Sequence, residues 1–299
     1  MRHGTGSKKI WGVKQGGVML RQVLGVVGVA CALIAAPLSA AGAADLPSYK
    51  GPALLPPPPP PAAYSWTGCY VDAGAGYGFW NQDHYATGPA AIFVGGHFVP
   101  IGNSSTVTTT DGGRGWLGRF GGGCDYQTPL FNNRFVVGIF GDYDVMSMSG
   151  SNSSSVVCGP CLTPMTANEK ETGAWYVGGR VGYLVNPAFL AFVDGGYTET
   201  SFAQSAEISV APGTPVGFTY PNFTDQGWFI GGGGEYALDW LPIRGLFLKG
   251  EYRFAQYNSV NLVETQTNGA GPSGEVETTK PYVQTVTGSL VWRFNWNGR

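Results

Sequence analysis

The first candidate for chemistry is the cysteine pair in the segment VVCGPCLTP, residues 156–164, which spells the tetrapeptide of thioredoxin-like redox sites. A reactive thiolate in such a site needs the N-terminus of a helix that follows a strand. Here the pair stands between SGSNSSS and LTPMTANEK, and no apolar helix follows. We therefore expect Cys158 and Cys161 to close a small disulfide ring in an exposed loop. Free thiols, metal binding and a redox site are the alternatives.

The histidines give little support for catalysis. After the N-terminal leader the chain has only His84 and His97, with Asp83 beside the first and serines at 104 and 105. Closeness in sequence does not set the geometry of a catalytic triad, so we expect no enzyme, no catalytic residue, no cofactor and no bound metal. Haem contact through the two histidines and Tyr85 is an alternative, as is lipid-modifying chemistry at this loop.

The N-terminus has the order of a secretory signal. Basic residues precede the apolar run VLGVVGVACALIAAPLSA, and the small residues Ala41-Gly42-Ala43 follow it. The run is shorter than the roughly 20 residues of a membrane-spanning helix. We predict a signal peptide over 1–43, with Met19 as an alternative start, and a proline-rich periplasmic linker over 44–65. Cys31 leaves with the signal, and the four remaining cysteines favour disulfides.

Composition points to a sheet protein whose outer surface does not face water. Only 12% of the residues are charged, 13% are aromatic, and 48 are glycine, while the formal net charge is −2. A charge this small gives no basic surface for nucleic acid. The remaining residues, 66–299, form one predicted domain.

Eight segments of about a dozen residues read as strands, a length that suits a tilted strand crossing a bilayer. They cover 68–79, 116–127, 134–145, 174–185, 190–201, 227–238, 246–257 and 282–294. The connections alternate between long polar segments, 80–115, 146–173, 202–226 and 258–281, and tight turns such as NPAF. The pattern predicts an all-β fold: an eight-stranded antiparallel transmembrane β-barrel of the outer-membrane type, with long extracellular loops and short periplasmic turns. A soluble β-sandwich is the alternative fold.

Alternation along the strands assigns one face to lipid and the other to the interior of the barrel. The inward charges are seven acids and five bases, and opposite charges must pair there because an isolated buried ion is costly. Two readings stay open: a salt-bridged core, or a narrow ion-conducting path for which inward glycines such as Gly74, Gly76, Gly121, Gly231 and Gly233 leave space. The predicted lumen charges are Asp72, Arg119, Asp125, Asp142, Asp144, Arg180, Asp194, Glu235, Lys249, Glu251, Arg253 and Arg293.

A second cysteine pair lies on the first two predicted strands. Facing residues in an antiparallel pair have a constant sum of numbers, and a sum of 193 sets Cys69 opposite Cys124 and Gly78 opposite Gly115. Parity places both cysteines on the lipid side near the periplasmic end. We predict a cross-strand disulfide, with two free buried thiols as the alternative.

Several motifs resemble a known family. The segments AADLP, the proline-rich arm, SWTGCYVDAGAGYG and a final strand ending in WRF look like the small outer-membrane β-barrel proteins of rhizobia, Brucella and Bartonella, although Cys69 replaces their usual phenylalanine. The resemblance implies an eight-stranded, OmpA-like barrel with structural, surface-antigen or porin-like roles, and haemin binding in some members. It also implies that the assembly machinery reads the last strand. Here that signal would comprise Gly288, Leu290, Trp292 and Phe294, followed by NWNGR.

The sequence therefore predicts a non-enzymatic protein of the bacterial outer membrane with a structural and surface-exposed role. A small porin is the alternative. The expected partners are outer-membrane lipid and lipopolysaccharide, the barrel-assembly machinery, and peptidoglycan through the N-terminal arm. A closed barrel has no free edge, so a monomer is expected.

Overall fold

The computed structural model describes residues 65–94, 97–130, 132–158, 161–203, 206–209, 215–267, 269 and 271–294. The chain divides into two compact units, Met1–Pro59 and Pro60–Arg299. Only residues of the second unit are described. The predicted signal peptide and all but the last residue of the predicted linker lie outside the described residues.

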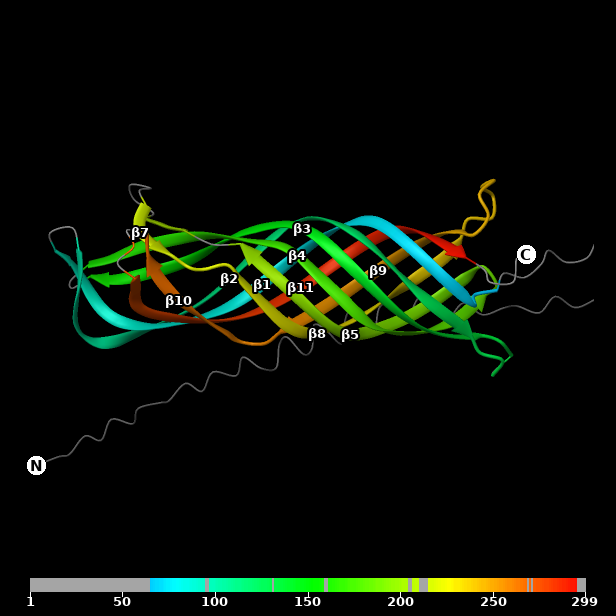
Figure 1. Ribbon diagram of the computed structural model, residues 1–299, viewed down its shortest axis with the longest axis horizontal. Helices are drawn as coiled ribbons and strands as arrows, with labels where there is room; N and C mark the ends of the chain where they lie inside the picture. The colour runs from blue at the N-terminus through cyan, green and yellow to red at the C-terminus, as the bar shows by residue number, and fades with distance from the viewer. Residues whose placement is uncertain are drawn as a thin grey trace, which may run out of the picture. The chain divides into compact units, whose positions relative to one another are not determined.

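The described residues form one antiparallel sheet that closes on itself (Figure 1). Neighbouring strands pair in the order β1-β2-β3-β4-β5-β8-β9-β11, and β11 pairs back with β1, so eight strands form the ring. This confirms the predicted eight-stranded antiparallel barrel. The ring strands are β1 (Gly68–Val94), β2 (His97–Gln127), β3 (Phe135–Cys158), β4 (Cys161–Asn186), β5 (Phe189–Ala203), β8 (Phe223–Ala237), β9 (Leu246–Tyr257) and β11 (Gly271–Phe294).

Most of the ring strands are longer than predicted. The β1–β2 hairpin stays paired as far as Val94 and His97, and the β3–β4 hairpin as far as Cys158 and Cys161. The prediction of these segments as loops was wrong in this respect. Backbone pairing between two adjacent strands does not depend on lipid, and segments such as STVTTT are rich in residues that favour strands. We call residues 80–115, 146–173, 202–226 and 258–281 the extracellular extension.

Three short strands complete this extension. They are β6 (Ala206–Ser209), β7 (Pro215–Thr219) and β10 (Val260–Gln266). The strand β6 pairs with β4 and β7, and β10 pairs with β7 and β11. In Figure 1, β7 and β10 lie at the end of the barrel opposite to the short turns.

The short turns carry the residues that such turns need. Asn132 and Asn133, in the turn between β2 and β3, have φ angles of 62° and 57°. Asparagine tolerates this left-handed region better than most residues. Gly245, which has a φ of 78°, ends the turn between β8 and β9. These connections correspond to the predicted periplasmic turns.

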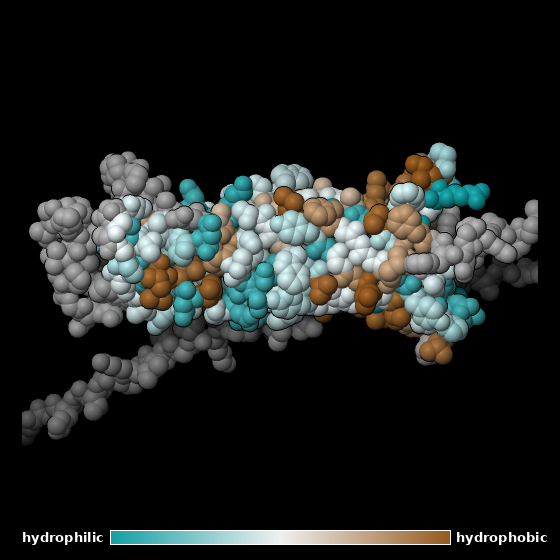
Figure 2. Space-filling model, viewed as in Figure 1, coloured by the Kyte–Doolittle hydropathy of each residue, from teal (hydrophilic) through white to brown (hydrophobic). Residues whose placement is uncertain are grey.

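The outer wall of the barrel is apolar and aromatic. The large side chains Val71, Ile139, Val193, Ile230 and Val286 all point outward and are exposed. Figure 2 shows brown and pale side chains on the wall, whereas teal groups are frequent on the half that carries β7 and β10 and at the turns. Aromatic side chains near the strand ends, of the kind that form interfacial girdles in outer-membrane barrels, are exposed. They are Tyr77, Phe79, Trp116, Tyr126, Trp175, Tyr183, Trp228, Tyr236 and Trp292. No helix in the described part of the chain is long and apolar enough to span a membrane.

Candidate functional site: the charged interior of the barrel

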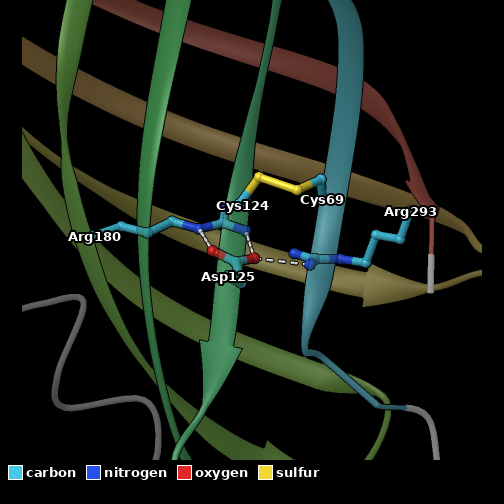
Figure 3. Close-up of a disulfide and its surroundings, with 5 residues drawn as sticks. All are labelled: Cys69, Cys124, Asp125, Arg180 and Arg293. Carbon is cyan, nitrogen blue, oxygen red and sulfur yellow. Dashed lines mark hydrogen bonds and ion pairs between the residues drawn. A yellow bond between two sulfur atoms is a disulfide. The ribbon is translucent and has the colours of Figure 1, made fainter. Parts of the chain in front are cut away.

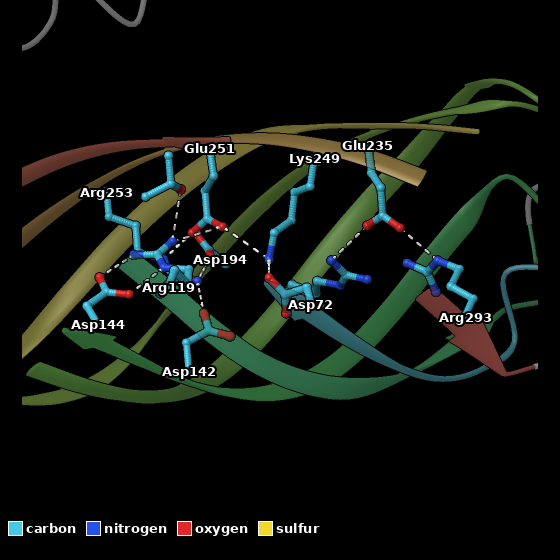
Figure 4. A network of polar contacts seen from close by, with 12 residues as sticks. Asp72, Arg119, Asp142, Asp144, Asp194, Glu235, Lys249, Glu251, Arg253 and Arg293 are labelled. Carbon is cyan, nitrogen blue, oxygen red and sulfur yellow. Dashed lines mark hydrogen bonds and ion pairs between the residues drawn. The ribbon is translucent and has the colours of Figure 1, made fainter. Parts of the chain in front are cut away.

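The twelve charged side chains predicted to face the lumen lie inside the barrel, each with an exposed fraction of 6% or less. Every one of them makes an ion pair with another member of the set. Strand alternation brings them inward from all eight ring strands, so residues that lie far apart in the sequence meet in one interior (Figure 4). They divide into two groups, one near the periplasmic turns and one in the middle of the barrel.

The periplasmic group is a closed ring of two arginines and two acids. Arg293 donates to Asp125 and to Glu235, at 2.7 Å in each case. Arg180 also donates to both acids, through Nε to Asp125 at 2.8 Å and through Nη1 to Glu235 at 3.3 Å. Each guanidinium thus joins the same two carboxylates. The ring ties β2, β4, β8 and β11 together across the lumen.

The middle group is built around Glu251, on β9. Its carboxylate lies 3.4 Å from Arg119 Nη1 and 3.6 Å from Lys249 Nζ, and it also pairs with Arg253. Each of these three bases also pairs with one or two further acids. Arg119 donates to both oxygens of Asp144 at 2.7 and 2.6 Å, and Lys249 Nζ lies 2.6 Å from Asp72. Arg253 contacts Asp142 at 2.5 Å and Asp194 at 3.3 Å. The group holds five acids and three bases.

Aromatic rings surround the guanidinium groups. The carbon Cζ of Arg253 lies 5.0, 5.0 and 5.1 Å from the ring centres of Phe140, Tyr176 and Phe229. Arg180 lies 4.5 Å from the ring centre of Tyr70. Cation–π contacts of this kind stabilise a desolvated guanidinium that cannot reach water.

Trp66 closes the periplasmic end of the interior. It is 1% exposed, its Nε1 donates to the carbonyl oxygen of Pro187 at 3.1 Å, and its backbone N–H donates to Gln127 at 3.1 Å. Its ring centre lies 5.0 Å from that of Phe247. The residue precedes β1, so the chain that enters the barrel folds underneath the ion-pair ring.

A second apolar layer lies on the extracellular side of the middle group. Trp80 is fully buried, donates from Nε1 to the carbonyl oxygen of Met148 at 3.4 Å, and packs edge-on against Phe202. Phe202 stacks on Phe223 with ring centres 4.9 Å apart. The ion pairs are therefore enclosed by aromatic side chains at both ends.

Two of the inward glycines lie directly against charged side chains. A Cβ atom added to Gly121 would overlap the carboxylate of Asp142, and one added to Gly231 would overlap that of Asp194. The space above these glycines is filled by the charged side chains. The expectation that the glycines leave space for a conducting path is not met at these two positions.

Above the Trp80 layer the interior carries buried acids and one histidine. His84 pairs with Glu277, and Glu169 lies close enough to both for their charges to act on it. Burial acts to lower the pKa of His84, but its hydrogen bond to Glu277 and the nearby acids raise that pKa above its ordinary value. Burial raises the pKa of Glu169 to about 7, and the pKa of Glu171 to about 8. The sequence did not predict this cluster, because its members lie in segments that were expected to be loops and in fact continue the alternation of β1, β4 and β11.

The other predicted site residues fall in several places. Cys69 and Cys124 form a disulfide between β1 and β2 (Figure 3), on the face of β2 opposite to Asp125. Cys158 and Cys161 face each other across β3 and β4, but their side chains lie outside the described residues. Gly288, Leu290, Trp292 and Phe294 all lie on the exposed, outward face of β11.

The side chains of His84 and of its two neighbours in sequence, Asp83 and Tyr85, lie on opposite faces of β1. His84 is buried inside, whereas Asp83 and Tyr85 point outward, and Asp83 accepts a hydrogen bond from Thr110 at 2.9 Å. The side chains of His97, Ser104 and Ser105 lie outside the described residues. The described part of the chain holds no cluster of three histidine, cysteine or acidic side chains that could bind a metal ion.

Known proteins similar to this chain include bacterial outer-membrane proteins. The chain is 25% identical over 207 residues to the 31 kDa outer-membrane immunogenic protein of Brucella melitensis, which covers 69% of this chain and 77% of the relative. The protein of that name from Brucella suis matches to the same extent. Among solved structures, OprG from Pseudomonas aeruginosa has 10% identity and a TM-score of 0.41, covering 76% of this chain and 97% of its own. Residues 31–294 match the outer membrane protein beta-barrel domain. The chain therefore belongs to this family of bacterial outer-membrane β-barrel proteins.

Proposed function

We propose that this protein is a non-conducting, non-enzymatic barrel that strengthens the outer membrane and displays its extracellular extension at the cell surface. The observation that carries the proposal is the buried state of the twelve lumen charges, all of which are ion-paired. An ion that crossed this interior would have to break several buried pairs, and breaking one costs about 3–5 kcal/mol. The aromatic layers around Trp66 and Trp80 support the same conclusion.

The test is single-channel conductance of the mature protein, from Ala44 onward, refolded into planar bilayers. Folding is verified by the shift in gel mobility between unheated and boiled samples. We expect a silent bilayer. Reproducible conductance steps that change in the double variant Asp142→Asn with Arg180→Gln, but not in the exposed-turn variant Arg134→Gln, would overturn the proposal and assign a pore.

A small cation-preferring porin is the second candidate. The middle group has five acids against three bases, and one carboxylate oxygen of Asp142 and one of Asp194 accept no hydrogen bond from the described residues. Such oxygens favour hydration and rearrangement of the network. A pore of this kind would prefer cations, and neutralising Asp194 would reduce that preference.

Surface display is supported by the name of the Brucella relatives, which calls them immunogenic. We propose that the β1–β2 and β3–β4 hairpins of this chain are likewise reached by antibodies on intact cells. Antibodies raised against the β1–β2 hairpin should label intact cells, and labelling only after permeabilisation would contradict surface display.

The separation of His84 from Asp83 and Tyr85 on opposite faces of β1 argues against both an enzyme and a haem site there.

A further inference from the structure

One face of the extracellular extension carries two outward-pointing bases in a single row. Arg114 on β2 is the pairing partner of Ser149 on β3, and Ser149 is the pairing partner of Lys170 on β4. All three side chains are exposed. Two strand spacings separate the bases, about 10 Å. We call Arg114, Ser149 and Lys170 the basic row.

The basic row differs from the charges inside the barrel because its bases have no carboxylate partner among the described residues. The exposed, outward positions of β2, β3 and β4 in this part of the extension carry hydroxyls, an amide and a glycine but no acid. They are Thr108, Thr110, Gly112, Ser147, Ser151, Asn168 and Thr172. Outward acids on the adjoining strands are engaged elsewhere: Asp83 accepts from Thr110, and Glu199 accepts from Trp175 and Gln226.

The row begins where the lipid-facing wall ends. Trp116, two residues from Arg114 on the same face of β2, is 71% exposed, and Tyr143, Val145 and Trp175 continue the apolar wall on β3 and β4. Exposed aromatic residues at this height mark the interface between hydrocarbon and lipid head groups. The bases therefore lie at the depth of the head groups in the outer leaflet.

We propose that the basic row binds the phosphate groups of lipopolysaccharide in the outer leaflet. A guanidinium offers paired donors that match a phosphate, an ammonium adds a mobile positive charge, and the serine hydroxyl between them donates a further hydrogen bond. The surface is continuous with the lipid-facing wall and complementary in charge to a phosphorylated glycolipid. The inference rests on the proposed exposure of the extension beyond the outer leaflet, and not on whether the lumen is closed.

The experiment compares the refolded full-length mature protein with the double variant Arg114→Gln and Lys170→Gln in phosphatidylcholine vesicles. Each is titrated with fluorescent lipopolysaccharide, either intact or with its phosphates removed. Each base near an anionic membrane surface strengthens binding about fivefold, so the double variant should bind intact lipopolysaccharide about thirtyfold more weakly. Removal of the phosphates should weaken binding to the wild-type protein to a similar extent.

The matched control removes two bases from the periplasmic turns, Arg134→Gln with Arg244→Gln, and should bind like the wild type. Ser149→Asp, which places a negative charge between the bases, should weaken binding without removing either base. Equal binding by the wild type and the double variant would overturn the proposal. Equal competition by phosphatidylglycerol vesicles would overturn the choice of a glycolipid. Folding is checked by the heat shift, and conductance separately tests the closed lumen.

Discussion

The guanidinium of Arg293 lies 4.7 Å from the ring centre of Trp66, so the last strand of the barrel and the residue that precedes the first strand meet inside the lumen. Arg293 also donates hydrogen bonds to the carboxylates of Asp125 and Glu235. The contact joins the aromatic layer at the periplasmic end to the ring of ion pairs above it. Pairing of β1 with β11 around the barrel wall is thus accompanied by a contact between the two ends of the barrel inside the lumen.

Trp66→Ala should destabilise the barrel by about 3–5 kcal/mol, because a large buried ring is lost and Arg293 loses the nearest of its three aromatic contacts. The measurement is the free energy of unfolding in urea, in lipid vesicles. Trp240→Ala is the matched control, since Trp240 lies in a turn and is 70% exposed. If Trp66→Ala lowered the free energy of unfolding as little as Trp240→Ala, Trp66 would not seal the periplasmic end.

Asp125→Asn should cost about 3–5 kcal/mol, because it leaves the guanidinium groups of Arg180 and Arg293 short of a buried partner. The heat-shift temperature on a gel and the urea midpoint should both fall. Arg134→Gln should change neither quantity appreciably, since Arg134 is exposed. A urea midpoint for Asp125→Asn equal to that of the wild type would show that water already reaches this ring.

The extracellular extension should become less stable as the pH rises. The pKa of Glu169 is raised from 4.5 to about 7, so its contribution is present at acid pH and is lost as the pH rises through about 7. The raised pKa of His84 acts in the same direction, because the ion pair with Glu277 is lost when the imidazole loses its proton. Hydrogen exchange of β1 and β4 amides in the extension, corrected for intrinsic rates, should therefore be faster at pH 8 than at pH 5.

Glu169→Gln should reduce this pH dependence, because the amide resembles the protonated acid. Glu199→Gln, which changes a half-exposed acid on β5, should retain it. NMR titration of His84 in the wild-type protein gives an independent check, with an expected pKa above the ordinary value of a histidine. Exchange rates with no dependence on pH, after correction, would contradict the proposed role of the cluster.

Loss of the Cys69–Cys124 disulfide should destabilise the protein by about 4 kcal/mol in the chain-entropy model, given the sequence separation of 55 residues. Cys69→Ser with Cys124→Ser should lower the urea midpoint, and the wild-type protein should show no free thiol at these two positions by mass spectrometry after alkylation. Alkylation of Cys69 or Cys124 in the unreduced protein would contradict the bond.

The sequence by itself determined the number of ring strands, the alternation of long and short connections, and the side of each strand that faces inward. These features follow from period-two patterning and from register sums, which are local or pairwise properties. The same arithmetic places Cys69 opposite Cys124, and the structure pairs these two residues.

Only the tertiary structure decided which inward charges pair and how far the strands extend. Arg180 and Arg293 share the same two acids because ring closure brings β2, β4, β8 and β11 around one lumen, a relationship that no spacing along the chain encodes. The sequence pattern did not show that Trp66, Trp80 and Glu169 lie in the interior. The first precedes the first predicted strand, and the other two lie in segments predicted as loops. Their burial depends on contacts across the barrel, whereas a sequence pattern reports only the face on which a residue lies.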